Sequence, residues 1–350
     1  MTANETLIPV NVITGFLGSG KTTLLQRLLA SPRLANTAVL INEFGEVGLD
    51  HLLLKRVDTE TVVLQSGCVC CTIRSDLTEA MRDLFGKRER GEIPPFDRLV
   101  IETTGLADPA PIVFTLMAEP VIRHHFRLGN IIATVDAVNG ALHLADNPET
   151  EKQVAVADRL VLTKTDMCSV EQARLMKDTL RRLNPSAPIC ESAVDDIDPD
   201  ALLANDLYDP TTKSDEVRRW LRDEARNGAA RGDGHALDVN RHDRKIRAFC
   251  LTYDQPLDWT AFGIWLTMLL HAHGEKVLRV KGLLNVIDAP TPVVIHGVQH
   301  VIHSPVHLER WPDGDHRSRI VFIVRDLEQA DIERSLAAFN RLGDVERRVA

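Results

Sequence analysis

No stretch of this 350-residue sequence is apolar over enough length to cross a lipid bilayer. A membrane-spanning helix needs about 18–20 consecutive apolar residues, and the longest candidate, 262–270, is about half that length and is typical of a core helix. The N-terminus has no basic stretch before its first apolar segment, which begins at Ile8 and ends in glycines rather than in a cleavage site. We therefore expect no membrane span, no secretory signal and a cytoplasmic location.

The sequence also lacks an excess of basic residues. It carries 41 Lys and Arg against 50 Asp and Glu, which gives a formal net charge of −9. Nucleic acids and anionic lipids attract proteins through a positive field, and this composition does not supply one. We therefore expect no nucleic acid and no membrane as a partner.

Cysteine is scarce and unevenly placed. Of the six cysteines, Cys68, Cys70 and Cys71 fall within one short segment. Such clustering does not resemble a disulfide framework. In a chain without a secretory signal it indicates metal or redox chemistry in a reducing compartment.

From residue 8 to about residue 193, short β-branched runs alternate with amphipathic stretches. This alternation predicts an α/β fold with a mostly parallel, doubly wound sheet, because parallel strands need helical crossovers that cover both faces. The predicted strands lie at residues 10–14, 38–42, 61–65, 98–102, 131–135, 159–163 and 188–190. Helices are predicted at 21–29, 75–85 and 169–183, and Ser169 and Gln172 form a capping box at the start of the last one.

Residues 209–245 carry one predicted charged helix, at 215–225, followed by 226–234, which has almost nothing to bury, and the stretch is typical of a linker. We expect this linker to separate a first domain, residues 1–208, from a small α+β C-terminal domain, residues 246–345. In the second domain, strands are predicted at 246–253, 277–286, 293–303 and 320–324, with helices at 259–272 and 330–340.

The segment Gly15-Phe-Leu-Gly-Ser-Gly-Lys-Thr22 matches the phosphate-binding pattern G-x-x-x-x-G-K-[ST], and it stands between a predicted strand and a predicted helix. Its glycines let backbone N–H groups turn towards phosphates, and the helix adds its positive N-terminal end. Lys21 is expected to reach the β- and γ-phosphates, and the Thr22 hydroxyl to bind Mg²⁺. The first domain is therefore predicted to be a P-loop NTPase. The nucleotide-binding residues expected here are Gly15, Gly18, Ser19, Gly20, Lys21, Thr22 and Thr23.

Thr163-Lys164-Thr165-Asp166 follows a predicted buried strand, where guanine-binding P-loop proteins carry Asn-Lys-x-Asp. The Asp166 carboxylate can accept hydrogen bonds from N1–H and the exocyclic amine of guanine, a donor pair that adenine lacks. The stem of Lys164 can lie against the base. Thr163 replaces the usual Asn, which leaves one supporting hydrogen bond open. We therefore expect GTP as the nucleotide, with Ser192 and Ala193 in a further base-contacting loop.

A second acid ends a predicted buried strand, in Leu99-Val-Ile-Glu102-Thr-Thr-Gly105. P-loop enzymes place a Mg²⁺-supporting acid and a γ-phosphate sensor at such a position. Glu102 is expected to support Mg²⁺ with Thr22, and the Gly105 N–H to contact the γ-phosphate. The alternative for Glu102 is a satisfied acid at a strand end. Because no residue is recognisable as an arginine finger, we expect slow turnover.

Asn42-Glu43-Phe-Gly-Glu46 follows the second predicted strand, in the position of the first switch of a GTPase. Glu43 could approach Mg²⁺, which makes it, with Lys21 and Glu102, a candidate catalytic residue. Glu46 could reach a metal held at Cys70. The alternative is two solvated acids on a loop.

Ser66-Gly-Cys68-Val-Cys70-Cys71 lies between a predicted strand and a predicted helix and is therefore a loop. Zn²⁺ prefers tetrahedral thiolate and imidazole ligands, Cu⁺ accepts thiolates, and Co²⁺ tolerates the same geometry. Three ligands leave one coordination position open, which suits transfer better than permanent structure. The alternatives are a redox pair, which adjacent cysteines could form only with strain, and plain buried thiols. Three further cysteines are isolated and are treated as core or surface thiols: Cys168, Cys190 and Cys250.

Histidines recur in the second domain. On one continuous strand His296 and His300 would share a face but stand about 13 Å apart, and His303 would point to the other face. This geometry argues against a shared metal ion, so these residues and His307 are interpreted as facing solvent or a partner. Two histidines at a predicted helix end, His271 and His273, are expected to be solvated.

Taken together, the motifs resemble the CobW-like metal-handling GTPases, relatives of the GTPases that serve nickel insertion into hydrogenase and urease. The resemblance spans nearly the whole chain. It is carried in the first domain by residues 14–23, 42–46, 67–71, 102–108 and 163–166, and in the second by Leu278-Arg-Val-Lys-Gly282 and His296-Gly-Val-Gln-His300.

The resemblance implies a GTP-hydrolysing metal chaperone in which the nucleotide controls metal capture and release at Cys68, Cys70 and Cys71. Zn²⁺ is the first metal expected and Co²⁺ the second, with delivery to a metal-requiring client protein through the C-terminal domain and a possible GTP-dependent homodimer. The alternatives are a cobalt chaperone of cobalamin synthesis and a GTP-gated regulatory metal sensor without delivery. A small-molecule kinase is disfavoured by the absence of a recognisable acceptor site. The long histidine tracts of some family members are absent, which argues against storage.

Overall fold

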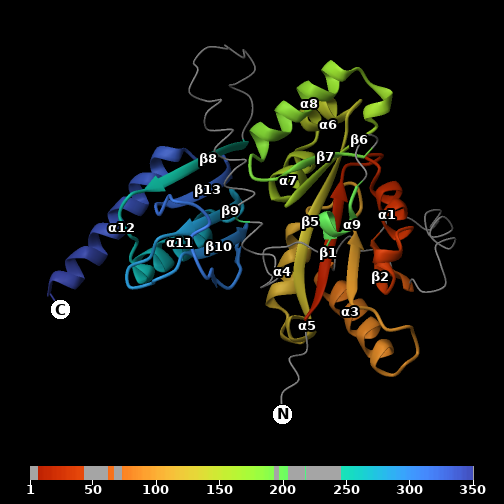
Figure 1. The fold of residues 1–350 in the computed structure, drawn as a ribbon, viewed down its shortest axis with the longest axis horizontal. Coiled ribbons are helices and arrows are strands. Elements are labelled where there is room, and N and C mark those ends of the chain that lie inside the picture. Colours follow the sequence, from red (N-terminus) through yellow and green to blue (C-terminus); the bar gives the residue numbers. More distant parts are fainter. Residues whose placement is uncertain are drawn as a thin grey trace. The chain divides into compact units, whose positions relative to one another are not determined.

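The computed structural model describes residues 7–42, 62–66, 73–192, 197–203, 217 and 246–349. The chain divides into two compact units, Met1–Thr179 with Ala187–Asp209, and Leu180–Ser186 with Pro210–Ala350. Figure 1 labels the elements of both units. Apart from Val217, the predicted linker at 209–245 lies outside the described residues. No helix in the described part of the chain combines the length and apolar character that a membrane span requires.

The first unit is built on one fully parallel sheet, as the strand and helix alternation predicted. Its seven strands have the order β3-β2-β4-β1-β5-β6-β7, with β1 at the centre. The strands are β1 (Ile8–Gly15), β2 (Thr37–Asn42), β3 (Val62–Ser66), β4 (Arg98–Glu102), β5 (Phe126–Asp136), β6 (Arg159–Thr163) and β7 (Ile189–Glu191). Because all of them run in one direction, their carboxyl ends meet at one edge of the sheet, where ligands bind in open α/β folds.

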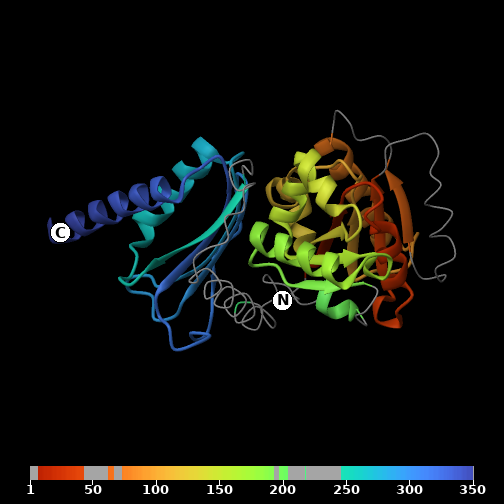
Figure 2. The same cartoon turned by 90° about the horizontal axis from the view of Figure 1, so that it is seen from above.

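Helices cover both faces of this sheet (Figures 1 and 2). One face is buried by α1 and α9, whose apolar residues share a core cluster with alternate residues of the strands, among them Ile13, Val100 and Ile132. The helices that lie wholly in this unit are α1 (Lys21–Leu29), α3 (Ile73–Glu89), α4 (Ala110–Ala118), α5 (Pro120–His125), α6 (Gly140–Asp146), α7 (Pro148–Val156) and α9 (Pro199–Leu203), with 3₁₀ turns at Pro32–Leu34 and Thr165–Met167. A further helix, α8 (Val170–Leu183), belongs to this unit up to Thr179.

The predicted capping box at the start of α8 is confirmed. The backbone N–H of Gln172 donates to Ser169 Oγ at 3.2 Å, and the backbone N–H of Ser169 donates to Gln172 Oε1 at 2.9 Å. Two donors that a helix start leaves without an intrahelical partner are thereby satisfied.

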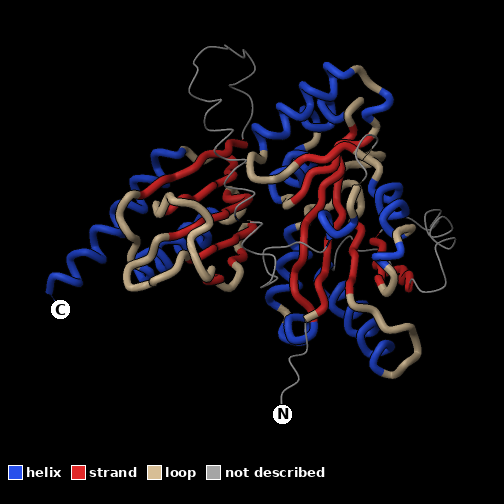
Figure 3. Tube along the Cα trace, viewed as in Figure 1, coloured by secondary structure: helices blue, strands red, loops and turns tan. Residues whose placement is uncertain are grey.

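The second unit is the expected small α+β domain. Its antiparallel strands have the order β11-β10-β9-β13-β8, and β12 pairs with β10. Figure 3 distinguishes its strands in red from its helices in blue. The elements are β8 (Ile246–Tyr253), α11 (Trp259–His273), β9 (Val277–Leu284), β10 (Val293–Val298), β11 (Val301–Ile302), β12 (Val306–His307), β13 (Ser318–Arg325) and α12 (Gln329–Val349).

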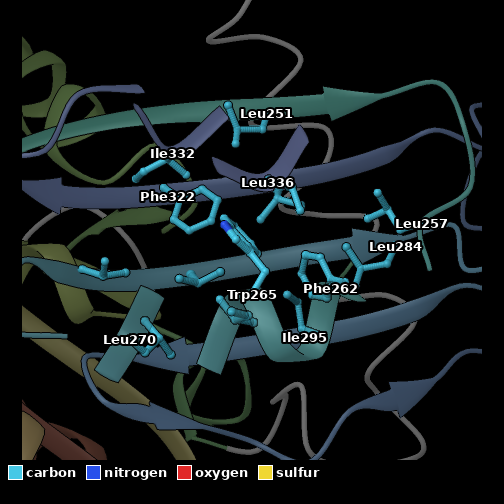
Figure 4. Packing of buried hydrophobic residues seen from close by; sticks show 14 of the residues in the cluster. Leu251, Leu257, Phe262, Trp265, Leu270, Leu284, Ile295, Phe322, Ile332 and Leu336 are labelled. Atoms are coloured by element: carbon cyan, nitrogen blue, oxygen red, sulfur yellow. The ribbon is translucent and has the colours of Figure 1, made fainter. Parts of the chain in front are cut away.

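The core of this unit lies between the sheet and the two helices (Figure 4). Trp265 of α11 packs edge-on against Phe322 of β13 with ring centroids 6.2 Å apart, and its indole N–H donates to Ser335 Oγ of α12 at 2.9 Å. The large ring is therefore buried without an unpaired donor. Asp258 caps the start of α11 by accepting a hydrogen bond from the Ala261 N–H at 2.8 Å.

The prediction of one continuous strand at 293–303 is wrong. The backbone turns back at Gln299, whose φ is 50°, and β10 and β11 pair as a hairpin. The His303 N–H then donates to the His296 carbonyl at 2.9 Å, so that the two residues lie opposite each other. Both are buried, with exposed fractions of 6% and 5%, and the prediction that they face solvent or a partner is also wrong. The other four histidines considered, His271, His273, His300 and His307, are exposed.

Candidate nucleotide-binding site

The P-loop joins the carboxyl end of β1 to the start of α1, and it is packed tightly against β5. Gly15 has a φ of 141°, and a Cβ there would lie 2.3 Å from Thr134 Oγ1 and 2.7 Å from Ser19 Oγ. Only glycine fits such a position. The Ser19 and Thr134 hydroxyls are hydrogen-bonded at 2.6 Å in the interior. The turn is therefore held in place by the neighbouring strand.

The Lys21 side chain reaches back across this loop. Its ammonium donates to the carbonyl of Gly15 at 3.0 Å and to that of Phe16 at 3.2 Å. Gly18 and Gly20 both have positive φ, at 70° and 92°. The ammonium thus lies at the turn where the sequence places the phosphates. Thr23, in the first turn of α1, is exposed.

Glu102 and Thr22 meet at the carboxyl end of β4. The Thr22 hydroxyl donates to Glu102 Oε1 at 2.6 Å, and Glu102 is only 3% exposed. Strand pairing sets Glu102 beside Ile13, immediately before the P-loop. A hydroxyl and a carboxylate are the hard oxygen ligands that Mg²⁺ prefers, so the pair fits the predicted ion.

The segment after Glu102 lies directly against the P-loop. A Cβ on Gly105 would stand 2.5 Å from the Leu17 backbone nitrogen and 2.7 Å from Leu17 Cα, which leaves room only for glycine. On its other side the segment contacts α7, because Gln153 Nε2 donates to the carbonyls of Gly105 at 3.1 Å and Ala107 at 3.0 Å. The motif did not single out Gln153. Its place directly before the apolar run Val154-Ala155-Val156 was the available signal.

The base-binding motif follows β6, next to β5. The Thr163 hydroxyl donates to the Ser19 carbonyl at 2.7 Å, so the residue that replaces asparagine ties the motif to the P-loop. Lys164 has left-handed backbone angles, with φ 57° and ψ 30°. Asp166 lies in the following 3₁₀ turn and is exposed. The structure thus brings the motif and the P-loop together.

Asp136, at the end of β5, organises this region and was not predicted. It is 1% exposed; Oδ1 accepts from the Val138 N–H at 2.7 Å and the Asn139 N–H at 3.2 Å, and Oδ2 accepts from Lys164 Nζ at 2.7 Å and Asn139 Nδ2 at 3.1 Å. Burial alone would raise the pKa of Asp136, but these hydrogen bonds outweigh it and lower the pKa below its ordinary value. Its position at a strand's carboxyl end, like that of Glu102, is the signal that could have found it.

Several predicted residues lie outside the described part of the chain: Glu43, Glu46, Cys68, Cys70, Cys71 and Ala193. Ser192 is described, and its carbonyl accepts a hydrogen bond from the Arg27 guanidinium. The three isolated cysteines, Cys168, Cys190 and Cys250, are half-buried, and no disulfide joins them within the described residues.

Two models of known protein families match two separate stretches of the chain. Residues 9–191 match the model of the CobW/HypB/UreG nucleotide-binding domain, and residues 246–340 match that of the cobalamin synthesis protein CobW C-terminal domain. The chain belongs to the CobW/HypB/UreG family of P-loop GTPases. It is therefore an enzyme that hydrolyses GTP, and the resemblance seen in the sequence is confirmed.

Individual relatives cover almost all of the chain. The zinc chaperone YjiA of Escherichia coli is 33% identical over 336 residues, which are 95% of this chain and 99% of YjiA. The zinc-regulated GTPase metalloprotein activator 1 of Schizosaccharomyces pombe is 29% identical over 351 residues, covering 92% of this chain and 83% of its own. The crystal structure of Zn(II)-bound YjiA GTPase from Escherichia coli superposes with a TM-score of 0.72 at 29% identity, covering 95% and 99% of the two chains.

Proposed function

We propose that this protein is a GTP-dependent metal chaperone. It would bind a thiophilic metal, zinc in the first place, at Cys68, Cys70 and Cys71 and transfer it to a client protein as GTP is hydrolysed. The observation that carries the proposal is the joining of the P-loop to the Glu102 segment, through the 2.6 Å contact from Thr22 to Glu102 and the fit of Gly105 against Leu17. The residues proposed to hold Mg²⁺ and the segment proposed to sense the γ-phosphate then belong to one connected site.

The nucleotide would lie along the carboxyl edge of the sheet. Lys21 would bind the β- and γ-phosphates, with backbone N–H groups of the P-loop around them. Lys164 and Asp166 would contact guanine. Thr22 and Glu102 would hold Mg²⁺, which when bound neutralises charge on the phosphate oxygens. Glu43 is proposed to approach the same ion from the first switch.

The metal to be transferred would be held by thiolates. Zn²⁺ suits such ligands, and relatives that share almost the full length are named zinc chaperones. Co²⁺ tolerates the same tetrahedral thiolates and is the alternative, as a cobalt chaperone of cobalamin synthesis. Three cysteines without a fourth ligand leave a position through which a client's ligand can enter.

The proposal places the protein in the cytoplasm, where thiols stay reduced. It assigns the GTPase domain to residues 1–208, a linker to 209–245 and client binding to the domain at 246–345. A net charge of −9 supports a protein client rather than nucleic acid or a membrane. A GTP-dependent homodimer is compatible with it.

The test is a Co²⁺ and Zn²⁺ titration of the reduced protein with GDP, with a non-hydrolysable GTP analogue and without nucleotide. Co²⁺ should produce sulfur-to-metal charge-transfer absorption that is lost in Cys70→Ser and kept in the matched control Cys250→Ser. Metal affinity should differ between the two nucleotide states by about tenfold, or about 1.4 kcal/mol of coupling. Tight binding that ignores the nucleotide, without delivery to an apo-client, would instead indicate a metal sensor. No thiolate signal at all would refute the metal site.

A further inference from the structure

The segment that contains Gly105 is held at two points by the helix α7. The Gln153 side chain is 1% exposed, and its Nε2 group donates one hydrogen to the Gly105 carbonyl and one to the Ala107 carbonyl. One residue further back, Lys152 Nζ forms an ion pair with Asp108 Oδ2 at 3.1 Å. Two consecutive residues of α7 therefore bind three residues of the same short segment, 105–108: Gly105, Ala107 and Asp108.

The orientation of the Gln153 amide is set by these two donated hydrogen bonds. Its Oε1 atom is buried and has no hydrogen-bond partner within the part of the chain that the structure describes. Leaving an acceptor unpaired in the interior is unfavourable. The two hydrogen bonds that Nε2 donates to the carbonyls therefore offset the cost of the unpaired Oε1 atom. The primary amide of glutamine suits this role because its one neutral nitrogen carries two hydrogens, one for each carbonyl.

The Lys152 contact reinforces the same segment at its far end. Asp108 uses Oδ2 for Lys152, and its Oδ1 accepts a hydrogen bond from the Ala110 N–H at 3.0 Å, at the start of α4. Both charged side chains are about a quarter exposed, so solvent screens this pair in part. Gln153 is thus expected to contribute more than Lys152.

The helix that makes these contacts is itself firmly placed. Along α7, Gln153, Val154, Ala155 and Val156 are all buried. A packed helix is a rigid support, whereas the 105–108 segment has an exposed Leu106 at its tip. Fixing the carbonyls on either side of Leu106 to α7 therefore holds the segment against the P-loop at Leu17.

We infer that Gln153 is a positioning residue for γ-phosphate recognition, and that the Lys152–Asp108 ion pair assists it. By fixing the Gly105 and Ala107 carbonyls, Gln153 orders the 105–108 segment before GTP binds. Ordering a segment in advance removes an entropic cost from the binding step. GDP lacks the phosphate that this segment would contact, so the affinity of the protein for GDP does not depend on how well the 105–108 segment is ordered. The inference rests on the proposed role of Gly105 as the γ-phosphate sensor.

The experiment compares GDP and a non-hydrolysable GTP analogue on the full-length protein, together with single-turnover GTP hydrolysis. Gln153→Leu keeps the approximate volume and removes both donors. Its affinity for the analogue should fall about tenfold or more, its affinity for GDP should change less than about twofold, and hydrolysis should slow. The matched control is Gln172→Leu, an exposed capping residue of α8, which should leave all three measurements unchanged.

A second pair of variants keeps the test informative if Gln153→Leu folds poorly. Lys152→Ala removes the ion pair from a partly exposed site and should lower the analogue-to-GDP affinity ratio several-fold, while Lys152→Arg keeps the cation and should restore the ratio. Equal losses for GDP and the analogue in Gln153→Leu, or an unchanged ratio in both Gln153→Leu and Lys152→Ala, would overturn the inference.

Gly105→Ala separates this outcome from failure of the proposed function. A Cβ at Gly105 cannot fit beside Leu17, so the analogue should bind more weakly if this segment senses the γ-phosphate. An unchanged ratio in Gly105→Ala would remove the sensor assignment itself, and the inference with it. A changed ratio in Gly105→Ala with an unchanged ratio in Gln153→Leu would refute the inference alone.

Discussion

Replacing Asp136 with asparagine tests whether the carboxyl end of β5 holds the base-binding motif in place. Asparagine keeps the shape of the side chain and one acceptor oxygen for the Val138 and Asn139 N–H groups. It turns the other oxygen into an NH₂ group that faces two donors, Lys164 Nζ and Asn139 Nδ2. A hydrogen bond to a charged group is worth about 1.5–3 kcal/mol, and the free energy of unfolding should fall by about that amount at neutral pH.

The same substitution should change how stability depends on pH. The pKa of Asp136 is lower in the folded protein than its ordinary value, so the unfolded chain binds this proton more readily. The carboxylate therefore contributes stability at pH values above the unfolded-state pKa, which is about 3.9. That contribution is lost as the pH falls through the folded-state pKa. The asparagine variant lacks it, so its stability should converge with that of the parent as the pH falls below about 4.

Urea unfolding at pH 7 and at successively lower pH measures both effects. The control is Asp146→Asn at the exposed end of α6, where the same change of charge should alter stability little. Because Lys164 would contact the base, which GDP and GTP share, both nucleotides should bind Asp136→Asn more weakly and to a similar extent. An unfolding midpoint equal to that of the parent at pH 7, with unchanged nucleotide affinity, would show that Asp136 does not hold this region.

Two further variants test the nucleotide assignment directly. Lys21→Ala should abolish tight binding of GTP and GDP, measured with a fluorescent nucleotide, while circular dichroism shows the fold retained; undiminished binding would contradict the phosphate assignment. Asp166→Asn should lower guanine-nucleotide affinity by about 1–3 kcal/mol in calorimetry, because a double acceptor becomes an amide. Since Asp166 is exposed, the thermal stability of the Asp166→Asn variant should equal that of the parent protein. Equal affinity of the unmutated protein for ATP and GTP would defeat the base assignment.

The strands were predictable because buried parallel strands are short, nearly continuous apolar runs. The bounds predicted for β4, β6 and β8 agree with the structure at both ends. Helix α4 carried no such signal: its sequence, Ala-Pro-Ile-Val-Phe-Thr-Leu-Met-Ala, is apolar almost all round and has no polar face to set a period. Proline near the start of α4, α5 and α7 was the available cue, since its ring suits the first helical turn.

The hairpin at β10 and β11 could not be read from its residues. Two-residue turns favour Gly, Asn or Asp because these tolerate positive φ, whereas this one uses Gln299. Without a turn signal at 299–300, the β-branched residues on both sides, Val293 to Val298 and Val301 to Ile302, are predicted as one strand. The facing positions of His296 and His303 depend on the turn, and so they could only come from the structure.

In the nucleotide-binding site, the sequence predicted the place of each motif but not the contacts that join one motif to another. Each motif is a local pattern, and its local placement followed from the sequence: the P-loop after β1, Glu102 at the end of β4 and Thr163 at the end of β6. The residues that join the motifs are distant in sequence. Asp136 and Lys164 are 28 residues apart, and Gln153 and Gly105 are 48 apart. Spacing within a motif carries no information about such pairs.

Asp136 and Gln153 belong to one continuous stretch of chain, which raises the question of whether the two ends of the site are coupled. After Asp136 the chain enters α6, where His143 lies against Phe16 of the P-loop with ring centroids 4.5 Å apart, and then α7, which carries Gln153. If α6 and α7 moved together, loosening the Asp136 end would also loosen the hold on Gly105. Asp136→Asn would then weaken binding of the GTP analogue more than binding of GDP, as Gln153→Leu should. Equal weakening of both nucleotides in Asp136→Asn means instead that α7 is fixed by its own buried face, and that base binding and phosphate sensing are supported separately.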